Sequence, residues 1–329
     1  MPQGSSFRLV AGIAFGLAAT ASTSFAQSTG TPAQQEPAVA NDPYQWLEDV
    51  KGDKSIAWVR EQNAKSEAEL AQSPQFRKLE ADVRAILDST AKIPGVEKIG
   101  DYYYNFWKDK QHERGLWRRT TLAEYRKDKP QWETVIDLDA LNKAEGENWV
   151  WHGVDCLRPD YTRCLVALSR GGSDADVTRE FDLASRTWVK DGFFRPEAKG
   201  GLGWVDKDTV YVYTDFGAGS MTPSGYPRIV KQWQRGTPMA QATKVYEGEP
   251  QDMYIAAQRD LTPGFQRDFV NRVIAFYNDE LFLRGADGKL VKVDAPNSAN
   301  KSVHKEWLVL ELRHAYEAGG KTHPPRSLI

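Results

Sequence analysis

The sequence carries almost no net charge, because 43 lysine and arginine residues stand against 45 aspartate and glutamate residues in a chain of 329. Proteins that bind nucleic acid normally present a basic face, so this balance argues against nucleic acid as a partner. Beyond residue 26 the sequence has no apolar run long enough to cross a bilayer. No membrane anchor is therefore predicted.

Histidine is also scarce, and no two histidines stand at the spacing that zinc sites use. Neither cysteine has a metal-ligating neighbour at the usual spacing. We therefore predict no metal and no cofactor. The five histidines are expected to be surface or hydrogen-bonded residues: His112, His152, His304, His314 and His323.

The first 26 residues are typical of a signal peptide. Arg8 gives a short, weakly positive start, and residues 9–21 form an apolar run too short to span a membrane. Small residues at 24 and 26 then provide the cleavage pattern. We expect cleavage near Ala26, a flexible polar leader over residues 27–41, and a periplasmic or secreted protein.

Only two cysteines are present, Cys156 and Cys164. Between them lie the turn-forming residues 158–160 (RPD), flanked by two apolar runs, so a β-hairpin would place the cysteines opposite each other. In an oxidising compartment we expect a disulfide with a Cα–Cα distance of about 4.4–6.8 Å. The alternative is a pair of reduced core thiols in a protein that stays in the cytosol.

Residues 42–95 are predicted to be a helical N-terminal segment. Asp53 is expected to cap a first helix that runs towards Leu70, and Ser73-Pro74 is expected to start a second. Apolar side chains then recur at helical spacing along the second segment as far as Leu87.

From residue 96 to residue 329 the pattern changes to short β-prone runs separated by turn residues, and no helix is predicted there. This pattern argues against a doubly wound parallel sheet. The runs expected to be strands are residues 101–107, 163–169, 209–214, 273–277 and 307–312.

A loose repeat indicates a β-propeller. Four segments with the same pattern of turn residues followed by a strand lie roughly fifty residues apart, the length of one propeller blade. The alternative is a β-sandwich with an extra β domain. The four segments are residues 131–135, 186–189, 243–246 and 289–293.

This repeat gives about four blades and part of a fifth. Residues 319–322 (GGKT) have the composition of a hairpin turn rather than of a closing strand. The fold class predicted is mainly β, an incomplete propeller over residues 96–329. An incomplete ring leaves a blade face uncovered at each end, so we expect self-association through residues 102–104 and 307–310.

Several motifs resemble those of prolyl-oligopeptidase-family serine peptidases. Residues 42–49 (DPYQWLED) resemble the opening of those proteins, and residues 58–63 (WVREQN) the helix that follows it. Residues 169–175 (SRGGSDA) with 179–182 (REFD) are similar to a blade motif of bacterial members, as is the long run from Gly200 to Arg228.

The resemblance implies a helical stretch, a seven-bladed propeller that restricts entry to short peptides, and a following α/β-hydrolase domain. The catalytic serine, aspartate and histidine of the family belong to that hydrolase domain, so no position here receives a catalytic role. We expect the chain alone to be inactive, with the peptide substrate reached through the missing hydrolase domain.

Two glycine-rich motifs imitate catalytic or binding loops. Residues 171–175 (GGSDA) approximate the G-x-S-x-G nucleophile elbow, but the elbow needs a strand–turn–helix setting and these residues lead into another strand. Residues 217–220 (GAGS) lack the following helix and lysine of a phosphate loop. Both are interpreted as turns between strands.

Two functions remain open. The chain is either the propeller portion of an exported prolyl-oligopeptidase-like serine endopeptidase, or a propeller segment that binds a protein or peptide by itself. A Ser/His/Asp-bearing hydrolase sequence directly downstream in the genome would favour the first.

Overall fold

The structure, a computed structural model, describes residues 42–329. The chain divides into two units, one ending at Ile86 and the other spanning Leu87–Ile329. The predicted signal peptide and leader lie outside the described residues.

The first unit is helical. A 3-10 helix, η1 (Gln45–Glu48), precedes α1 (Asp53–Leu70) and α2 (Pro74–Asp88). The helix start at Asp53 is confirmed, but the cap is wrong: Gly52 occupies the N-cap, and Asp53 lies in the first turn, where its charge suits the helix dipole. At α2, Ser73 Oγ accepts a hydrogen bond from the Phe76 amide at 3.1 Å, as expected for a capping serine.

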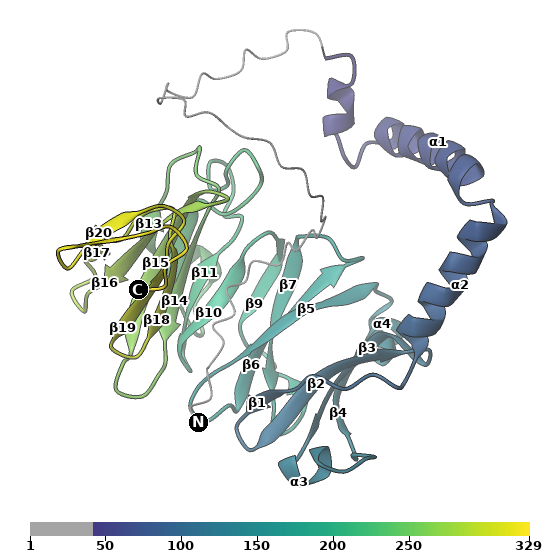
Figure 1. Ribbon diagram of the computed structural model, residues 1–329, viewed down its shortest axis with the longest axis horizontal. Coiled ribbons are helices and arrows are strands. Elements are labelled where there is room, and N and C mark those ends of the chain that lie inside the picture. The colour runs from purple at the N-terminus through teal and green to yellow at the C-terminus, as the bar shows by residue number, and fades with distance from the viewer. Residues whose placement is uncertain (1–41) are drawn as a thin grey trace. The chain divides into compact units, whose positions relative to one another are not determined.

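The second unit consists of antiparallel sheets that follow one another along the chain (Figure 1). The first four sheets each contain four consecutive strands in chain order, and in the second sheet a further strand pairs with β7. Their strands are β1 (Glu97–Ile99), β2 (Tyr102–Asp109), β3 (His112–Thr120) and β4 (Glu133–Asp137); β5 (Trp149–Cys156), β6 (Arg163–Arg170), β7 (Asp176–Asp182), β8 (Thr187–Trp188) and β9 (Phe194–Ala198); β10 (Gly201–Asp206), β11 (Thr209–Tyr213), β12 (Ile229–Gln234) and β13 (Thr243–Glu247); β14 (Tyr254–Asp260), β15 (Arg267–Ala275), β16 (Asn278–Arg284) and β17 (Leu290–Lys292).

The sequence repeat corresponds to the fourth strand of each sheet. The four repeated segments coincide with β4, β8, β13 and β17. Each of these strands closes one four-stranded antiparallel sheet, which is the unit of a propeller blade. The repeat therefore identified four blades correctly.

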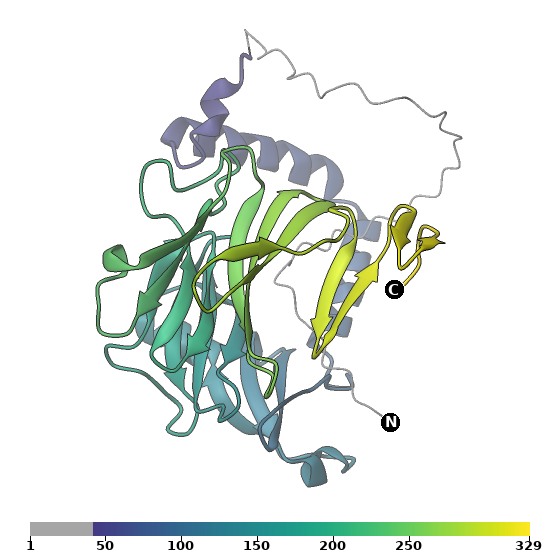
Figure 2. The same ribbon diagram turned by 90° about the vertical axis from the view of Figure 1, so that its left-hand side faces the viewer.

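A partial fifth sheet follows, drawn in yellow in Figure 2. β18 (Asn300–His304) pairs with β19 (Trp307–Glu311), and residues 327–329 then pair with β19 through hydrogen bonds between Leu310 and Ile329 of 2.8 and 2.9 Å. Between them lies a hairpin of β20 (Tyr316–Ala318) and β21 (Lys321–His323). The predicted turn at residues 319–322 lies at the tip of this hairpin, and the strand pairing of residues 327–329 was not foreseen.

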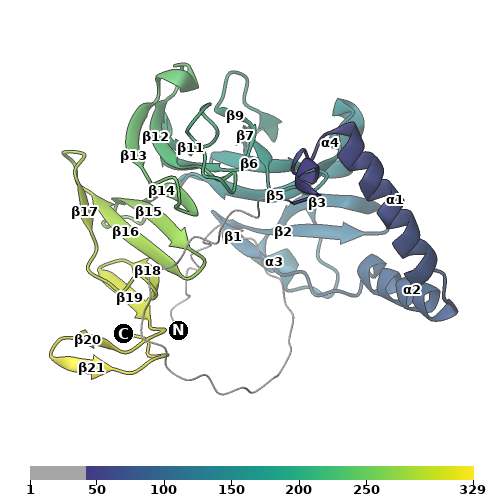
Figure 3. The same cartoon turned by 90° about the horizontal axis from the view of Figure 1, so that it is seen from above.

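The sheets pack face to face in chain order, so that within the second unit they form an open arc (Figure 3). Trp117 and Phe181 belong to the apolar cluster between the first two sheets, Leu165 and Val212 to the cluster between the second and third, and Tyr211 with Ile255 to the next. A smaller apolar cluster around Leu310 forms the core of the fifth sheet. About four blades and part of a fifth, as predicted, thus share interlocking cores.

Glycine is required where backbones approach closely. At Gly200, which links β9 to β10, φ is +142° and an added Cβ would lie 2.1 Å from the carbonyl oxygen of Tyr213. No other residue fits that contact without moving the strand. The glycines that suggested a family resemblance therefore have a packing role in the third sheet.

Two sequence expectations fail locally. Short helices α3 (Leu122–Tyr125) and α4 (Leu138–Glu145) interrupt the strands, although no helix was expected after residue 96. The signal for α4 was present, because Asp137 caps it by accepting the Ala140 amide at 2.9 Å and Gly146 ends it with φ of 67°. The expected strand 273–277 is instead the end of β15 and the turn that follows.

The two segments expected to be bare are largely covered. Tyr104 is 3% exposed and Leu310 is 6% exposed, since both point into the clusters between or beside sheets. Trp307 is the exception, with 65% of its surface exposed.

Trp117 and Trp307 form a matched pair for testing the cores. Trp117 is 3% exposed and contacts the rings of Tyr104, Trp151 and Phe181, with centroid distances of 5.0, 5.5 and 6.4 Å. Trp117→Ala should lower the free energy of unfolding by about 3–5 kcal/mol, because it opens a cavity between two sheets. Trp307→Ala should change it by only about 0.5 kcal/mol. Urea unfolding followed by circular dichroism measures both, and equal effects would contradict the assigned core.

Candidate functional site

The connections between the second and third strands of the second and third sheets contact each other, because Tyr226 hydrogen-bonds to Asp174. They are residues 171–175 in the second sheet and 214–228 in the third, and the corresponding turn of the fourth sheet is Phe276–Tyr277. Loops that carry function are positioned in this way by a rigid scaffold. The longest of the three, residues 214–228, lies in the run from Gly200 to Arg228 that resembles the family, so we take this connection as the candidate functional site.

The 214–228 connection is held by its own polar groups. Ser220 is 3% exposed, and its Oγ donates to the Gly217 carbonyl at 2.6 Å and accepts the Phe216 amide at 2.8 Å. Arg228 donates to the Gly219 carbonyl at 2.7 Å and to the Gly248 carbonyl at 2.8 Å. The connection is therefore a fixed platform, and its glycines serve a tight turn as predicted.

Tyr226 joins this platform to the second sheet. Its hydroxyl donates to Asp174 Oδ2 at 3.2 Å, and the ammonium group of Lys199 lies 4.2 Å from its ring centre and 3.5 Å from the same carboxylate. The Tyr254 ring, at the start of the fourth sheet, lies 6.2 Å away. Side chains of three sheets therefore meet at Tyr226.

A buried ionic network lies in the second sheet beside the 171–175 turn. The Arg195 side chain is fully buried and forms an ion pair with Asp176, and it also donates to the Ala198 carbonyl at 2.8 Å. Burial lowers the pKa of Arg195, although the attraction of Asp176 opposes that shift. The other oxygen of Asp176 lies 3.1 Å from Nδ1 of His152.

His152 reaches Asp176 because β5 contains a β-bulge. Trp151 pairs with Leu168 and Gly153 with Ala167, so His152 is the additional residue, and Gly153 has φ of 136°. Bulges commonly redirect a side chain beside a functional site. The sequence analysis expected His152 to be a surface or hydrogen-bonded residue, and it is hydrogen-bonded. Its partner was not predicted, since the only signal available was the glycine that breaks the alternating pattern.

Ser173 lies in a strand–turn–strand setting. The turn connects β6 to β7, and the Ser173 hydroxyl donates to the Ala175 carbonyl at 3.1 Å. Among residues 42–329, no group of three or more histidine, cysteine, aspartate or glutamate side chains is arranged to hold a metal ion. None of the described helices is both long and apolar enough to cross a membrane.

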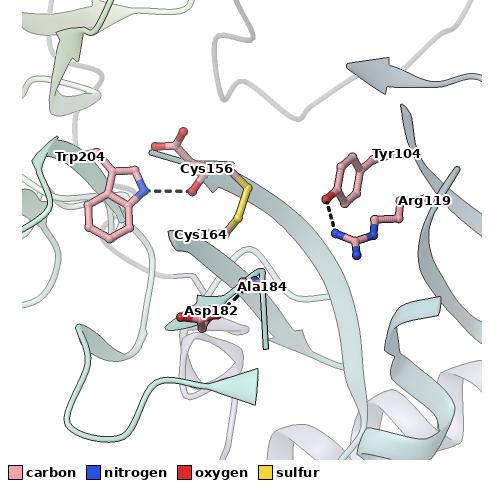
Figure 4. The surroundings of a disulfide bond; sticks show 8 residues. Tyr104, Arg119, Cys156, Cys164, Asp182, Ala184 and Trp204 are labelled. Atoms are coloured by element: carbon pink, nitrogen blue, oxygen red, sulfur yellow. Dashed lines mark hydrogen bonds between the residues drawn. A yellow bond between two sulfur atoms is a disulfide. The ribbon is translucent and has the colours of Figure 1, made fainter. Parts of the chain in front are cut away.

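Cys156 and Cys164 face each other in β5 and β6 and are joined as a disulfide (Figure 4). Their Cα atoms are 4.0 Å apart, slightly closer than the expected range. In Figure 4 the bridge lies between Trp204 of the third sheet and Tyr104 of the first. The Trp204 indole donates to the Asp155 carbonyl at 3.0 Å, so the bridged hairpin contributes to contacts on both sides.

The family model for the prolyl oligopeptidase N-terminal β-propeller domain matches residues 25–262. The chain belongs to this family. Its sheets are thus those of the N-terminal propeller domain of this family. Residues 42–49, whose sequence first suggested the resemblance, lie within the matched range.

Three relatives illustrate the similarity. Uncharacterized peptidase y4nA of Sinorhizobium fredii is 41% identical over 245 residues, which cover 74% of this chain and 34% of that protein. Uncharacterized peptidase RP174 of Rickettsia prowazekii is 30% identical over 82% of this chain and 39% of that protein. The solved structure of a post-proline cleaving enzyme from Rickettsia typhi has a TM-score of 0.79 and 30% identity, covering 87% of this chain and 43% of that one. The chain thus spans about a third to two-fifths of the length of the curated relatives it matches.

The disulfide should stabilise the second sheet modestly. The cysteines are 8 residues apart, and a loop this short is expected to add about 2 kcal/mol to the free energy of unfolding. Replacing both cysteines with alanine should remove that contribution, as measured by urea unfolding. In protein purified from the native host, alkylation should add mass only after reduction. Alkylation without reduction would instead show two free thiols.

Proposed function

We propose that this chain forms the substrate-gating propeller portion of an exported serine peptidase that acts on short peptides. In this proposal a hydrolase domain supplies the serine, aspartate and histidine, and the peptide substrate reaches them past the propeller. The observation that carries the proposal is the family match to the N-terminal propeller domain of prolyl oligopeptidase. The name of the Rickettsia typhi relative, a post-proline cleaving enzyme, suggests cleavage after proline.

The 214–228 platform supports a gating role. Selection by size needs an entrance whose parts keep fixed positions, because a mobile loop yields to a larger substrate. The hydrogen bonds of Ser220, Arg228 and Tyr226 hold this platform, and Tyr226 also ties it to the neighbouring sheet. We therefore assign discrimination by peptide length to the platform and to its anchor at Asp174.

The gate is tested in the peptidase that contains these residues. The kcat/KM for a short proline-containing peptide is compared with that for a peptide of about thirty residues. Tyr226→Ala should lower the short-to-long ratio by roughly fivefold, since it removes a contact worth about 1 kcal/mol that holds the entrance. An unchanged ratio, with the fold intact by circular dichroism, would contradict the gate.

Tyr277 provides the matched control. It is an exposed tyrosine on the neighbouring Phe276–Tyr277 turn, and it forms no hydrogen bond with residues of the 214–228 connection in the described structure. Tyr277→Ala should leave the short-to-long ratio at its wild-type value. A similar loss in both variants would indicate a general loosening of the propeller.

Export is part of the same proposal. It rests on the signal-peptide pattern of residues 1–26 and is consistent with a disulfide between Cys156 and Cys164. The intact mass of periplasmic or secreted protein from the native host should correspond to a chain that begins near Gln27. Soluble cytosolic protein that retains Met1 to Ala26 would contradict export.

The alternative function is a propeller that binds a protein or peptide by itself. The exposed apolar side chains of Val291 and Trp307, which are 63% and 65% exposed, favour it. A stable monomer with a cooperative thermal transition would favour this alternative.

A further inference from the structure

The interface between the third and fourth sheets has an apolar core with a polar row beside it. Val270 and Phe282 are direct partners in β15 and β16, and both belong to the apolar cluster that joins the two sheets. Two residues along each strand, the same face carries Asp268 and Arg284, which are again direct partners. Arg259 of β14 pairs with Asp268 on its other side. Three charged side chains therefore lie next to one another on the face that the fourth sheet turns towards the third.

The third sheet presents a matching polar pair. Tyr211 and Gln232 are direct partners in β11 and β12, and Tyr211 is buried. Arg284 joins the two sheets, since its Nη1 donates to the Tyr211 hydroxyl at 3.2 Å and to Gln232 Oε1 at 2.9 Å. Within the fourth sheet, Arg259 donates to Asp268 Oδ2 at 3.0 Å. The polar row is therefore connected to both sheets by hydrogen bonds.

Two atoms of this row are enclosed by protein and have no partner. Asp268 Oδ1 and Arg284 Nε are both shielded from solvent, and neither forms a hydrogen bond with any of the described residues. Their residues lie directly opposite each other in β15 and β16, yet no hydrogen bond joins the two atoms. Native proteins rarely leave a buried donor and a buried acceptor unsatisfied, because each has lost its bonds to water on folding.

The chemistry of these two atoms selects the species that can lie between them. A carboxylate oxygen only accepts hydrogen bonds, and a guanidinium nitrogen only donates them. A cation would be repelled by Arg284 and an anion by Asp268. Water both donates and accepts, so it is the small molecule that satisfies both atoms.

The Tyr211 hydroxyl can supply a third bond to such a water molecule. It accepts from Arg284 Nη1 and still has its own proton to donate. Burial raises the pKa of Tyr211 to about 12, and the nearby charge of Asp268 acts in the same direction. The hydroxyl therefore keeps its proton at neutral pH.

We propose that a buried water molecule is bound between the third and fourth sheets, where it accepts a hydrogen bond from Arg284 Nε and donates one to Asp268 Oδ1. The Tyr211 hydroxyl donates the third bond, which gives the number that buried waters usually make. The water completes the polar row and so helps to fix the fourth sheet against the third. The site lies away from the 214–228 platform and does not depend on the gating function proposed for it.

A high-resolution crystal structure of the peptidase that contains these residues tests the site directly. A single peak of density should lie about 2.7–3.2 Å from both Asp268 Oδ1 and Arg284 Nε. A direct hydrogen bond from Arg284 Nε or from the Tyr211 hydroxyl to Asp268 Oδ1, with no peak between them, would overturn the proposal. An anomalous signal at the peak in crystals grown with bromide in place of chloride would assign it to an anion and would overturn it equally.

Asp268→Asn tests the role of the carboxylate. The amide leaves one oxygen for both Arg259 and the water, so the water should no longer be held. Oxygen-17 magnetic relaxation dispersion, which detects long-lived buried waters in solution, should show about one fewer per chain than in wild type. The same number of long-lived waters in a folded Asp268→Asn protein would contradict the site.

Asp287→Asn is the matched control. Asp287 lies in the exposed turn between β16 and β17 of the same sheet, where its Oδ1 accepts the Lys289 amide at 3.0 Å. Asparagine keeps that acceptor, so this variant should retain both the density peak and the wild-type number of long-lived waters. Loss of the water in both variants would indicate a general loosening of the fourth sheet and would overturn the assignment to Asp268.

Discussion

Burial of apolar side chains between successive sheets is the interaction on which the second unit depends. Each sheet is too small to cover its own faces, so its stability comes from the neighbours on either side. Trp117, Val212 and Ile255 mark three successive interfaces, and all three are nearly or fully buried. The Tyr226 anchor and the Arg195 network are positioned by this series of cores, because their residues lie on strands or connections that the cores fix in place.

Sequence reasoning identified the blades because their signal is repeated and local. Turn residues followed by a short strand recur once per sheet, and the structure places β4, β8, β13 and β17 at those segments. The motif from Gly200 to Arg228 similarly pointed to the family. Helix α4 was missed although Asp137 caps its start and Gly146 caps its end. The strong β pattern on both sides of it outweighed a short helical pattern.

The polar sites could not be predicted in the same way. His152, Asp176 and Arg195 are separated by 24 and 19 residues. A bulge in β5 brings His152 to Asp176, and the pairing of β9 with β7 brings Arg195 to it. The Arg118 guanidinium lies 4.2 Å from the ring centre of Trp132, and these two residues lie on either side of α3, whose presence was not predicted. Such contacts depend on strand register and on the conformation of the connecting loop, and neither can be predicted from the local pattern of residues.

The anchoring of Tyr226 has a mechanical consequence. The residue belongs to the third sheet, its hydroxyl partner Asp174 to the second, and its ring neighbour Tyr254 to the fourth. Sliding of any one of these sheets along its neighbour would separate a donor from its acceptor or a ring from its ring. The second, third and fourth sheets are therefore expected to move as one rigid body. Sliding between sheets of the arc is expected at interfaces that lack such contacts.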